Sequence, residues 1–190
     1  KTSKTMAYTK VSIPKNGDGA GCPSPKSSDI IIMDVEDIET EPTRTLGNVA
    51  VTGNYTLKEG AKAVCVYGTP KTIAASEEYS GDADARGVKQ GVEFEHPGNE
   101  KDIKNFVEAF MNKGVVILVK ECDGSAAGRV QAFGNKCNPL FLTVERTDSS
   151  EANKRKLTWK QDIAGKFLPA DYEGELPALA DAATAAGEGA

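Results

Sequence analysis

The sequence predicts a mainly β protein, a β-sandwich or barrel with one flanking α-helix at about residues 99–113 and extended arms at both ends. Three observations predict this fold class. Short apolar or alternating runs recur between turn-forming residues, as in proteins built from many short strands. One segment has the 3.6-residue period of an amphipathic helix. Both ends are polar and lack periodicity, and 190 residues suit a single domain.

Residues 1–29 are polar and rich in glycine and proline, so they predict an extended N-terminal arm before a β-rich domain at 30–163. The apolar run 30–33 predicts the first strand, and an acidic loop follows it. Residues 88–96 alternate, with Val88, Gln90, Val92 and Phe94 on one face, which predicts a half-buried strand. Further strands are expected at 48–52, 62–67 and 72–79.

The helix follows Pro97 and Gly98, which end the preceding strand. Asn99 is the expected N-cap, and acidic residues in the first turn suit the helix dipole. One apolar stripe, which we assign to the core, runs along the helix up to Gly114. It comprises Ile103, Phe106, Val107, Phe110 and Met111.

Four more strands are expected after the helix, and Leu157 and Trp159 alternate onto one core face of the last of them. The pattern decays from Ala164, so residues 164–190 are assigned to a C-terminal arm or tail. The expected strands lie at 115–120, 129–133, 140–146 and 156–161.

Composition excludes several classes of protein. The formal net charge is −5 and the pI about 5.1, which argues against nucleic-acid binding, because that affinity comes from Lys and Arg neutralising phosphates. No apolar run approaches the roughly 20 residues of a membrane helix. Lys1–Lys10 lacks the apolar core of a secretory signal, so we expect none.

The residue patterns indicate no catalytic site, metal site or cofactor. His96 is the only histidine and stands in a turn, so we interpret it as a surface residue. Residues 82–93 echo an EF-hand loop, but Arg86 occupies a ligand position and no helices flank it, so a solvated acidic loop is favoured. The sequon Asn54-Tyr55-Thr56 is interpreted as accidental.

The four cysteines lack the close spacing of a zinc site. Cys65 lies within an apolar run and is expected to be a small core residue. Cys122 and Cys137 flank a predicted hairpin. Either they face each other, or, as we favour, they are free thiols of a reducing compartment.

The order of segments around the helix resembles that of the major tail proteins, or tail-tube proteins, of tailed bacteriophages, especially those of Bacteroidetes-like hosts. A strand ending in His96-Pro97-Gly98 leads into the helix at 99–113 and then into the apolar strand Val115–Val119. Gly134-Asn135-Lys136-Cys137-Asn138-Pro139-Leu140 then leads into another strand. The resemblance covers about residues 47–161.

The resemblance implies a structural virion protein without enzymatic activity, made in the host bacterial cytoplasm and located in the phage tail. Its subunits would form hexameric rings whose sheets join into a continuous tube lining. The rings would stack through the N-terminal arm and the 72–87 loop. Partners would be other copies and other tail proteins, and DNA would pass through the lumen without specific binding or membrane contact.

We assign the subunit interface that this implies to seven apolar residues in the arms and strands. They are Ile13, Ile30, Ile32, Ile73, Tyr79, Phe167 and Leu168.

Two alternatives stay open at this point. The same polar arms would serve a capsid-decorating or head–tail connector protein. A ligand- or carbohydrate-binding β-sandwich would require clustered aromatic residues, whereas the tyrosines and the tryptophan are scattered along the chain.

For the tube that the resemblance implies, the net negative charge predicts an acidic lumen. Such a lumen would repel phosphate and let DNA pass without adhesion.

Overall fold

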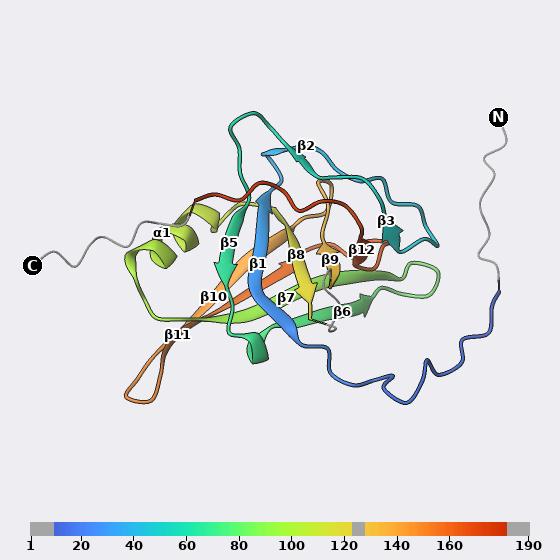
Figure 1. The fold of residues 1–190 in the computed structure, drawn as a ribbon, viewed down its shortest axis with the longest axis horizontal. Coiled ribbons are helices and arrows are strands. Elements are labelled where there is room, and N and C mark those ends of the chain that lie inside the picture. The colour runs from blue at the N-terminus through green and yellow to red at the C-terminus, as the bar shows by residue number, and fades with distance from the viewer. Residues whose placement is uncertain (1–9, 123–127, 182–190) are drawn as a thin grey trace, which may run out of the picture.

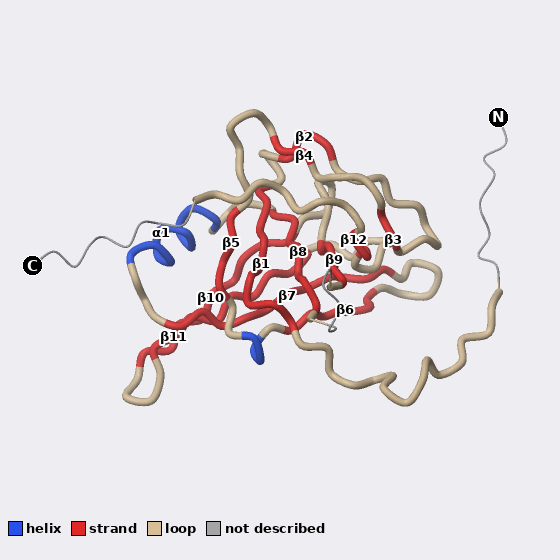
Figure 2. Tube along the Cα trace, viewed as in Figure 1, coloured by secondary structure: helices blue, strands red, loops and turns tan. Residues whose placement is uncertain are grey.

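A computed structural model describes residues 10–122 and 128–181, and it confirms a mainly β fold with one α-helix. Ten strands form one hydrogen-bonded network that does not close into a barrel, and β2 pairs with β4 separately. A single bridge, Leu140 to Val115, joins two layers within this network, so the architecture is sandwich-like. The red segments of Figure 2 show both layers.

The first layer, which we call the open sheet, is antiparallel throughout and has the order β10-β11-β7-β6. Its strands are β6 (Ala74–Ser80), β7 (Gly87–Pro97), β10 (Leu140–Asp148) and β11 (Asn153–Gln161).

The second layer, which we call the covered sheet, has the order β5-β1-β8-β9-β12-β3. Among the named strands of the described residues, β12 and β3 form its one parallel pair. Its strands are β1 (Lys26–Asp34), β3 (Ala50–Val51), β5 (Val64–Tyr67), β8 (Val115–Glu121), β9 (Arg129–Phe133) and β12 (Ala170–Tyr172).

The main hydrophobic core lies between the two sheets and beneath the helix. Alternation along β7 and β11 directs Val92, Phe94, Leu157 and Trp159 inward, and each is at most 1% exposed. They meet the inward residues of β1 and β8, including Ile30. The predicted core positions of Leu157 and Trp159 and the face containing Phe94 are confirmed.

A second apolar cluster covers the other face of the covered sheet. Met33, Leu118 and Tyr172 belong to it, together with Tyr55 from a connecting loop. The small sheet of β2 (Ile38–Thr40) and β4 (Thr56–Leu57) lies over this face in Figure 1, with the segment after β12. Both faces of the covered sheet are therefore buried, which explains its continuous apolar strands.

The helix α1 (Lys101–Phe110) is shorter than the predicted 99–113, and a 3₁₀ turn occupies Pro70–Thr72. Glu100 holds the N-cap position, because the Asn99 amide oxygen accepts a hydrogen bond from Arg155 Nη2 at 2.6 Å. Most of the predicted stripe packs on the core, but Met111 follows the helix and is 57% exposed.

The predicted division at residue 163 is wrong, because the following segment belongs to the domain. Ala170 and Tyr172 are buried, and β12 pairs with β9 and β3. Gly165 exchanges backbone hydrogen bonds with Val88, at 2.8 and 2.9 Å. The predicted tail at 182–190 lies outside the described residues.

At the other end, residues 10–25 are exposed and lack regular structure. The arm ends earlier than residue 29, because β1 begins at Lys26, which pairs with Glu121 of β8.

Candidate assembly surface

Two strands of the open sheet each have one side without a strand partner within the described part of the chain. β6 pairs only with β7. β10 pairs with β11 over its whole length, but with β8 only at Leu140. Such edges are templates for pairing with another chain. The sequence predicted the strand that became β6, but it did not indicate which strands would be edges.

The hydrogen bonds around β7 show which backbone groups of β6 point outward. Thr69 N–H donates to Glu95 O, and Glu95 N–H donates to Thr72 Oγ1, both at 2.9 Å, so Glu95 directs its backbone toward the β6 side. Backbone direction alternates along a strand. The backbone groups of Glu77 and Tyr79 therefore point away from β7, toward the free edge.

The same reasoning applies to β10. Asn153 O accepts from Gly98 N–H at 2.9 Å, so odd-numbered residues of β11 direct their backbone toward β7 and even-numbered ones toward β10. Lys156 therefore bonds with Glu145 of β10, and the backbone groups of Val144 and Arg146 point to the free edge.

The solvent face of the open sheet is charged, and its charges are paired across strands. Lys156 Nζ lies 3.0 Å from Glu93, and Lys154 Nζ lies 2.8 Å from Glu95. Lys160 lies 3.9 Å from Glu78. The strand register adds Lys89 and Glu145, which makes four lysines and four glutamates on this face.

The hydrogen bond that Lys156 donates to Glu93, together with the charge of that carboxylate, raises the pKa of Lys156 above its ordinary value. Both side chains are 40% exposed, so this pair contributes little to folding stability. Its consequence is electrostatic: the face is close to neutral at pH 7. The fold thus places glutamates of β7 beside the basic run Lys154-Arg155-Lys156 of β11.

The structure separates the seven residues predicted to form an interface. Ile30, Ile32 and Ile73 lie in the main core and cannot reach another subunit in this fold. Ile13 is 85% exposed in the arm and Tyr79 is 66% exposed on edge strand β6, so both are available.

The remaining two predicted residues, Phe167 and Leu168, are half-buried. The Arg44 guanidinium lies 5.3 Å from the Phe167 ring and donates to Leu168 O at 2.5 Å. They line a small cavity of about 350 Å³ that Tyr55 and Gln90 also line. Their contacts are therefore largely within the chain.

The residues considered for other chemistry are not brought together. The His96 ring is half-buried, with Nδ1 2.8 Å from Tyr67 O. Glu93 of the EF-hand-like stretch is engaged with Lys156, and the described residues contain no group of three or more potential metal ligands. In the sequon, Asn54 Oδ1 accepts a bond from Glu175 N–H at 3.0 Å.

All four cysteines are exposed and free. The prediction of Cys65 as a core residue is wrong, because alternation along β5 directs Val64 and Val66 inward and Cys65 outward. Partial desolvation of the sulfur beside neighbouring side chains raises the pKa of its thiol, and the nearby charge of Asp29 adds to this effect.

No protein-family model, curated protein or solved structure matches this chain. Across residues 10–122 and 128–181, no helix has the length and apolarity to span a membrane.

Proposed function

We propose that this chain is a self-assembling structural protein, a subunit of a phage-tail-type tube in which β6 of one copy pairs with β10 of the next. The observation that carries the proposal is a four-stranded sheet with two open edges and a charge-paired polar face. Edge strands of this length expose a monomer to aggregation through strand pairing, and pairing in a closed ring leaves no edge exposed.

Strand directions in the open sheet suit ring closure. Its four strands are antiparallel, so β6 and β10 run in opposite directions. Rotation about a ring axis preserves the direction of each strand relative to that axis. A junction between β6 and the neighbour's β10 is therefore antiparallel, and the alternation continues around the ring at every junction.

In this arrangement the charged face of the open sheet lines the lumen and the covered sheet lies outside. The sequence led us to expect an acidic lumen, whereas this face has balanced charges. Three of its four lysines lie 2.8–3.9 Å from glutamate carboxylates, so they are less available to phosphate groups. Passage of DNA without adhesion then follows from neutralised lysines, since DNA affinity arises from unneutralised ones.

Negative-stain electron microscopy of the purified chain at low and high concentration tests the proposal, and rings or tubes are expected. Glu77→Pro should abolish them. Proline removes an N–H that points outward from β6, so pairing with β7 is retained while the edge is blocked. Glu77→Thr keeps the N–H and is the matched control that should still assemble.

Arg146→Pro should block the β10 edge in the same way, with Arg146→Thr as its control. Each proline variant keeps one working edge. An equimolar mixture should therefore give a heterodimer that cannot extend, measurable by light scattering coupled to size-exclusion chromatography. Circular dichroism must show that each variant remains β-rich. A monomer at every concentration, or assembly unaffected by both prolines, would overturn the proposal and favour a decoration or connector role.

A further inference from the structure

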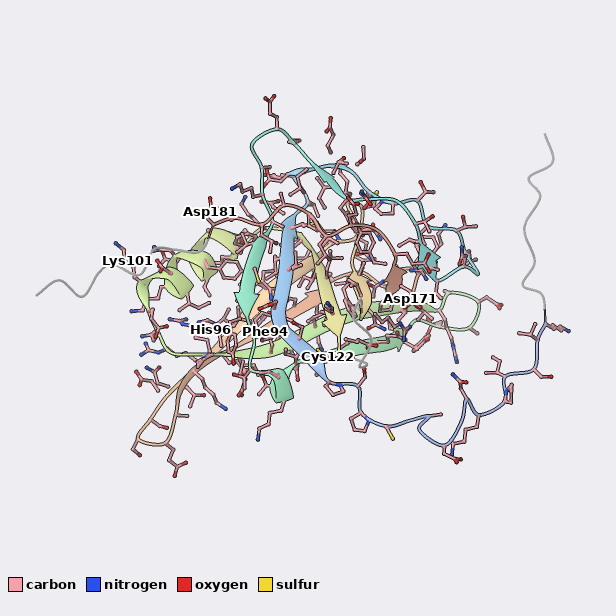
Figure 3. All side chains as sticks on the ribbon, viewed as in Figure 1. Phe94, His96, Lys101, Cys122, Asp171 and Asp181 are labelled. Carbon is pink, nitrogen blue, oxygen red and sulfur yellow. The ribbon has the colours of Figure 1, made fainter. Side chains whose placement is uncertain are left out.

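A groove of about 630 Å³ lies between the free edge of β5 and the N-terminal half of α1. Its floor is apolar, formed by Val66 of β5 and by Ile103 and Phe106 of the helix. In Figure 3, Asp181 is labelled beside α1 and His96 below it, and both residues line this groove. It is separate from the open edges of β6 and β10.

The β5 edge that borders this groove has unpaired backbone groups. Gly68 N–H donates to Ser28 O at 2.8 Å, so alternation directs the backbone of Val64 and Val66 toward β1 and that of Cys65 and Tyr67 outward. Tyr67 O lies against His96. Within the described chain, the Cys65 N–H and C=O and the Tyr67 N–H have no partner.

One end of this edge already pairs with an added segment. Ala63 N–H donates to Ala178 O at 2.9 Å, and Ala180 N–H donates to Ala63 O at 2.8 Å. The described pairing stops there, one step before Cys65. The edge therefore accepts strand addition, and the groove has room for it beside the helix.

The groove is acidic. Among the described residues, four carboxylates line it and no lysine or arginine does; they are those of Asp29, Glu100, Asp102 and Asp181. Lys62, outside the lining, lies 3.1 Å from Asp181, so the other three carry the acidic character. An occupant with apolar residues two apart and flanking basic residues would complement both the floor and the rim.

The N-terminal arm has this pattern. Val11 and Ile13 are two residues apart and 62% and 85% exposed, and Lys10 and Lys15 flank them. Pro14 lacks an N–H and suits the end of a short edge strand. In Figure 1 the arm leaves the domain on the side opposite α1. By contrast, residues 182–190 carry no bulky apolar side chain and no basic residue.

We propose that the groove between β5 and α1 binds residues 10–15 of a second copy of this chain as an added β-strand, with Val11 and Ile13 on the apolar floor. The proposal rests on the proposed self-assembly, and it identifies the site at which the arm holds a neighbouring subunit. A docked strand shares side-chain faces with β5. Ser12 then lies on the same face as Cys65, whereas Val11 and Ile13 lie on the face of Val66.

Disulfide cross-linking of the full chain tests this arrangement. Cys22, Cys122 and Cys137 are replaced by serine, Cys65 is kept, and one cysteine is introduced by Ser12→Cys or, as matched control, Ile13→Cys. After mild oxidation, Ser12→Cys should give covalent dimers and larger species on non-reducing gels. Ile13→Cys should give several-fold less, because paired cysteines must bring their Cβ atoms within about 4.5 Å. Adding Cys65→Ser should abolish the product.

Charge reversal provides a second readout. Asp29→Lys with Glu100→Lys should lower the Ser12→Cys cross-linking yield several-fold, and adding Lys10→Glu with Lys15→Glu should restore it. Failure of this rescue, equal yields from Ser12→Cys and Ile13→Cys, or no covalent product would overturn arm docking. A disulfide only within one chain would show that the arm occupies its own groove, which also overturns the proposal.

These outcomes are distinguishable from failure of the proposed function. Rings seen by microscopy without the expected cross-linking pattern would be consistent with the tube proposal and would contradict binding of the arm in the groove. Cross-linked dimers without rings would support docking of the arm in the groove and would contradict the proposal of a tube.

Discussion

At the scale of single residues, Tyr55 and Tyr172 connect the loops to the covered sheet. Their ring centroids lie 5.3 Å apart, and the Tyr172 hydroxyl accepts a bond from Tyr55 N–H at 3.3 Å while donating to Glu175 O at 2.6 Å. Tyr55 is 8% exposed. Its burial, reinforced by the nearby Glu41 and Tyr172, raises the pKa of its phenol above the ordinary 10.0.

This raised pKa predicts an alkaline loss of stability. Above pH 10 the unfolded chain releases the Tyr55 proton while the folded chain retains it, so stability falls as pH rises, by at most about 1.4 kcal/mol per pH unit. Tyr55→Phe should be nearly neutral at pH 7 and should make the decline between pH 10 and 11.5 shallower. Urea unfolding followed by circular dichroism measures it. Tyr67→Phe, at a position 46% exposed, is the control, and equal slopes in both variants would contradict the prediction.

At the scale of elements, the long segments with a clear period formed the elements that their sequence predicts, whereas the short strands were not predicted. The alternation of Val88–Phe94 produced β7, and Arg129–Phe133 formed β9 with the predicted bounds. β4 has two residues and β12 has three, too few for a period to be visible. The helix start moved from Asn99 to Glu100 because Arg155, distant in sequence, engages the Asn99 side chain.

The arm is an element that the domain does not need. Deleting residues 1–24 should leave a β-rich protein with an unchanged thermal midpoint, because residues 10–24 are exposed and the backbone hydrogen bonds described for them lie within the arm. Pro25 is kept because its carbonyl accepts a hydrogen bond from Cys122 N–H at 2.7 Å. A deletion of residues 1–29, the arm bounds that the sequence predicts, would also remove Lys26, which forms an ion pair with Glu121. The shortened chain should form rings that no longer stack into long tubes; tubes of normal length under the microscope would argue against a stacking role.

At the scale of the whole molecule, both ends of the chain looked like arms in sequence, but within the described chain residues 10–25 are exposed whereas residues 164–181 pack on the domain. Arg129 contacts Asp171 at 2.6 Å, and Tyr172 closes the second apolar cluster. The segment 164–181 therefore contributes to the folded domain although its own sequence shows no strand or helix periodicity.

Truncation after Ile163 should therefore destabilise the protein strongly. Losing the buried Tyr172 alone corresponds to about 3–5 kcal/mol, by comparison with large aromatic truncations. A typical domain has roughly 5–15 kcal/mol in total. The truncated chain should be largely unfolded or aggregated, as measured by circular dichroism and thermal unfolding, in contrast to the chain lacking residues 1–24. A cooperative unfolding transition at the midpoint of the full-length chain would contradict this prediction and support a domain that ends at residue 163.

The amino-acid sequence by itself determined the fold class, the helix and the inward faces of β7 and β11, because periodicity is local and Phe94 or Trp159 can be assigned a face from its neighbours alone. Only the tertiary structure decided which strands are edges, that Cys65 faces outward while Val64 and Val66 face the core, and that Glu93 neutralises Lys156. Each of these depends on strands far apart in sequence lying side by side. Pairing partners are selected by the packing of the whole chain, and no short segment carries that information.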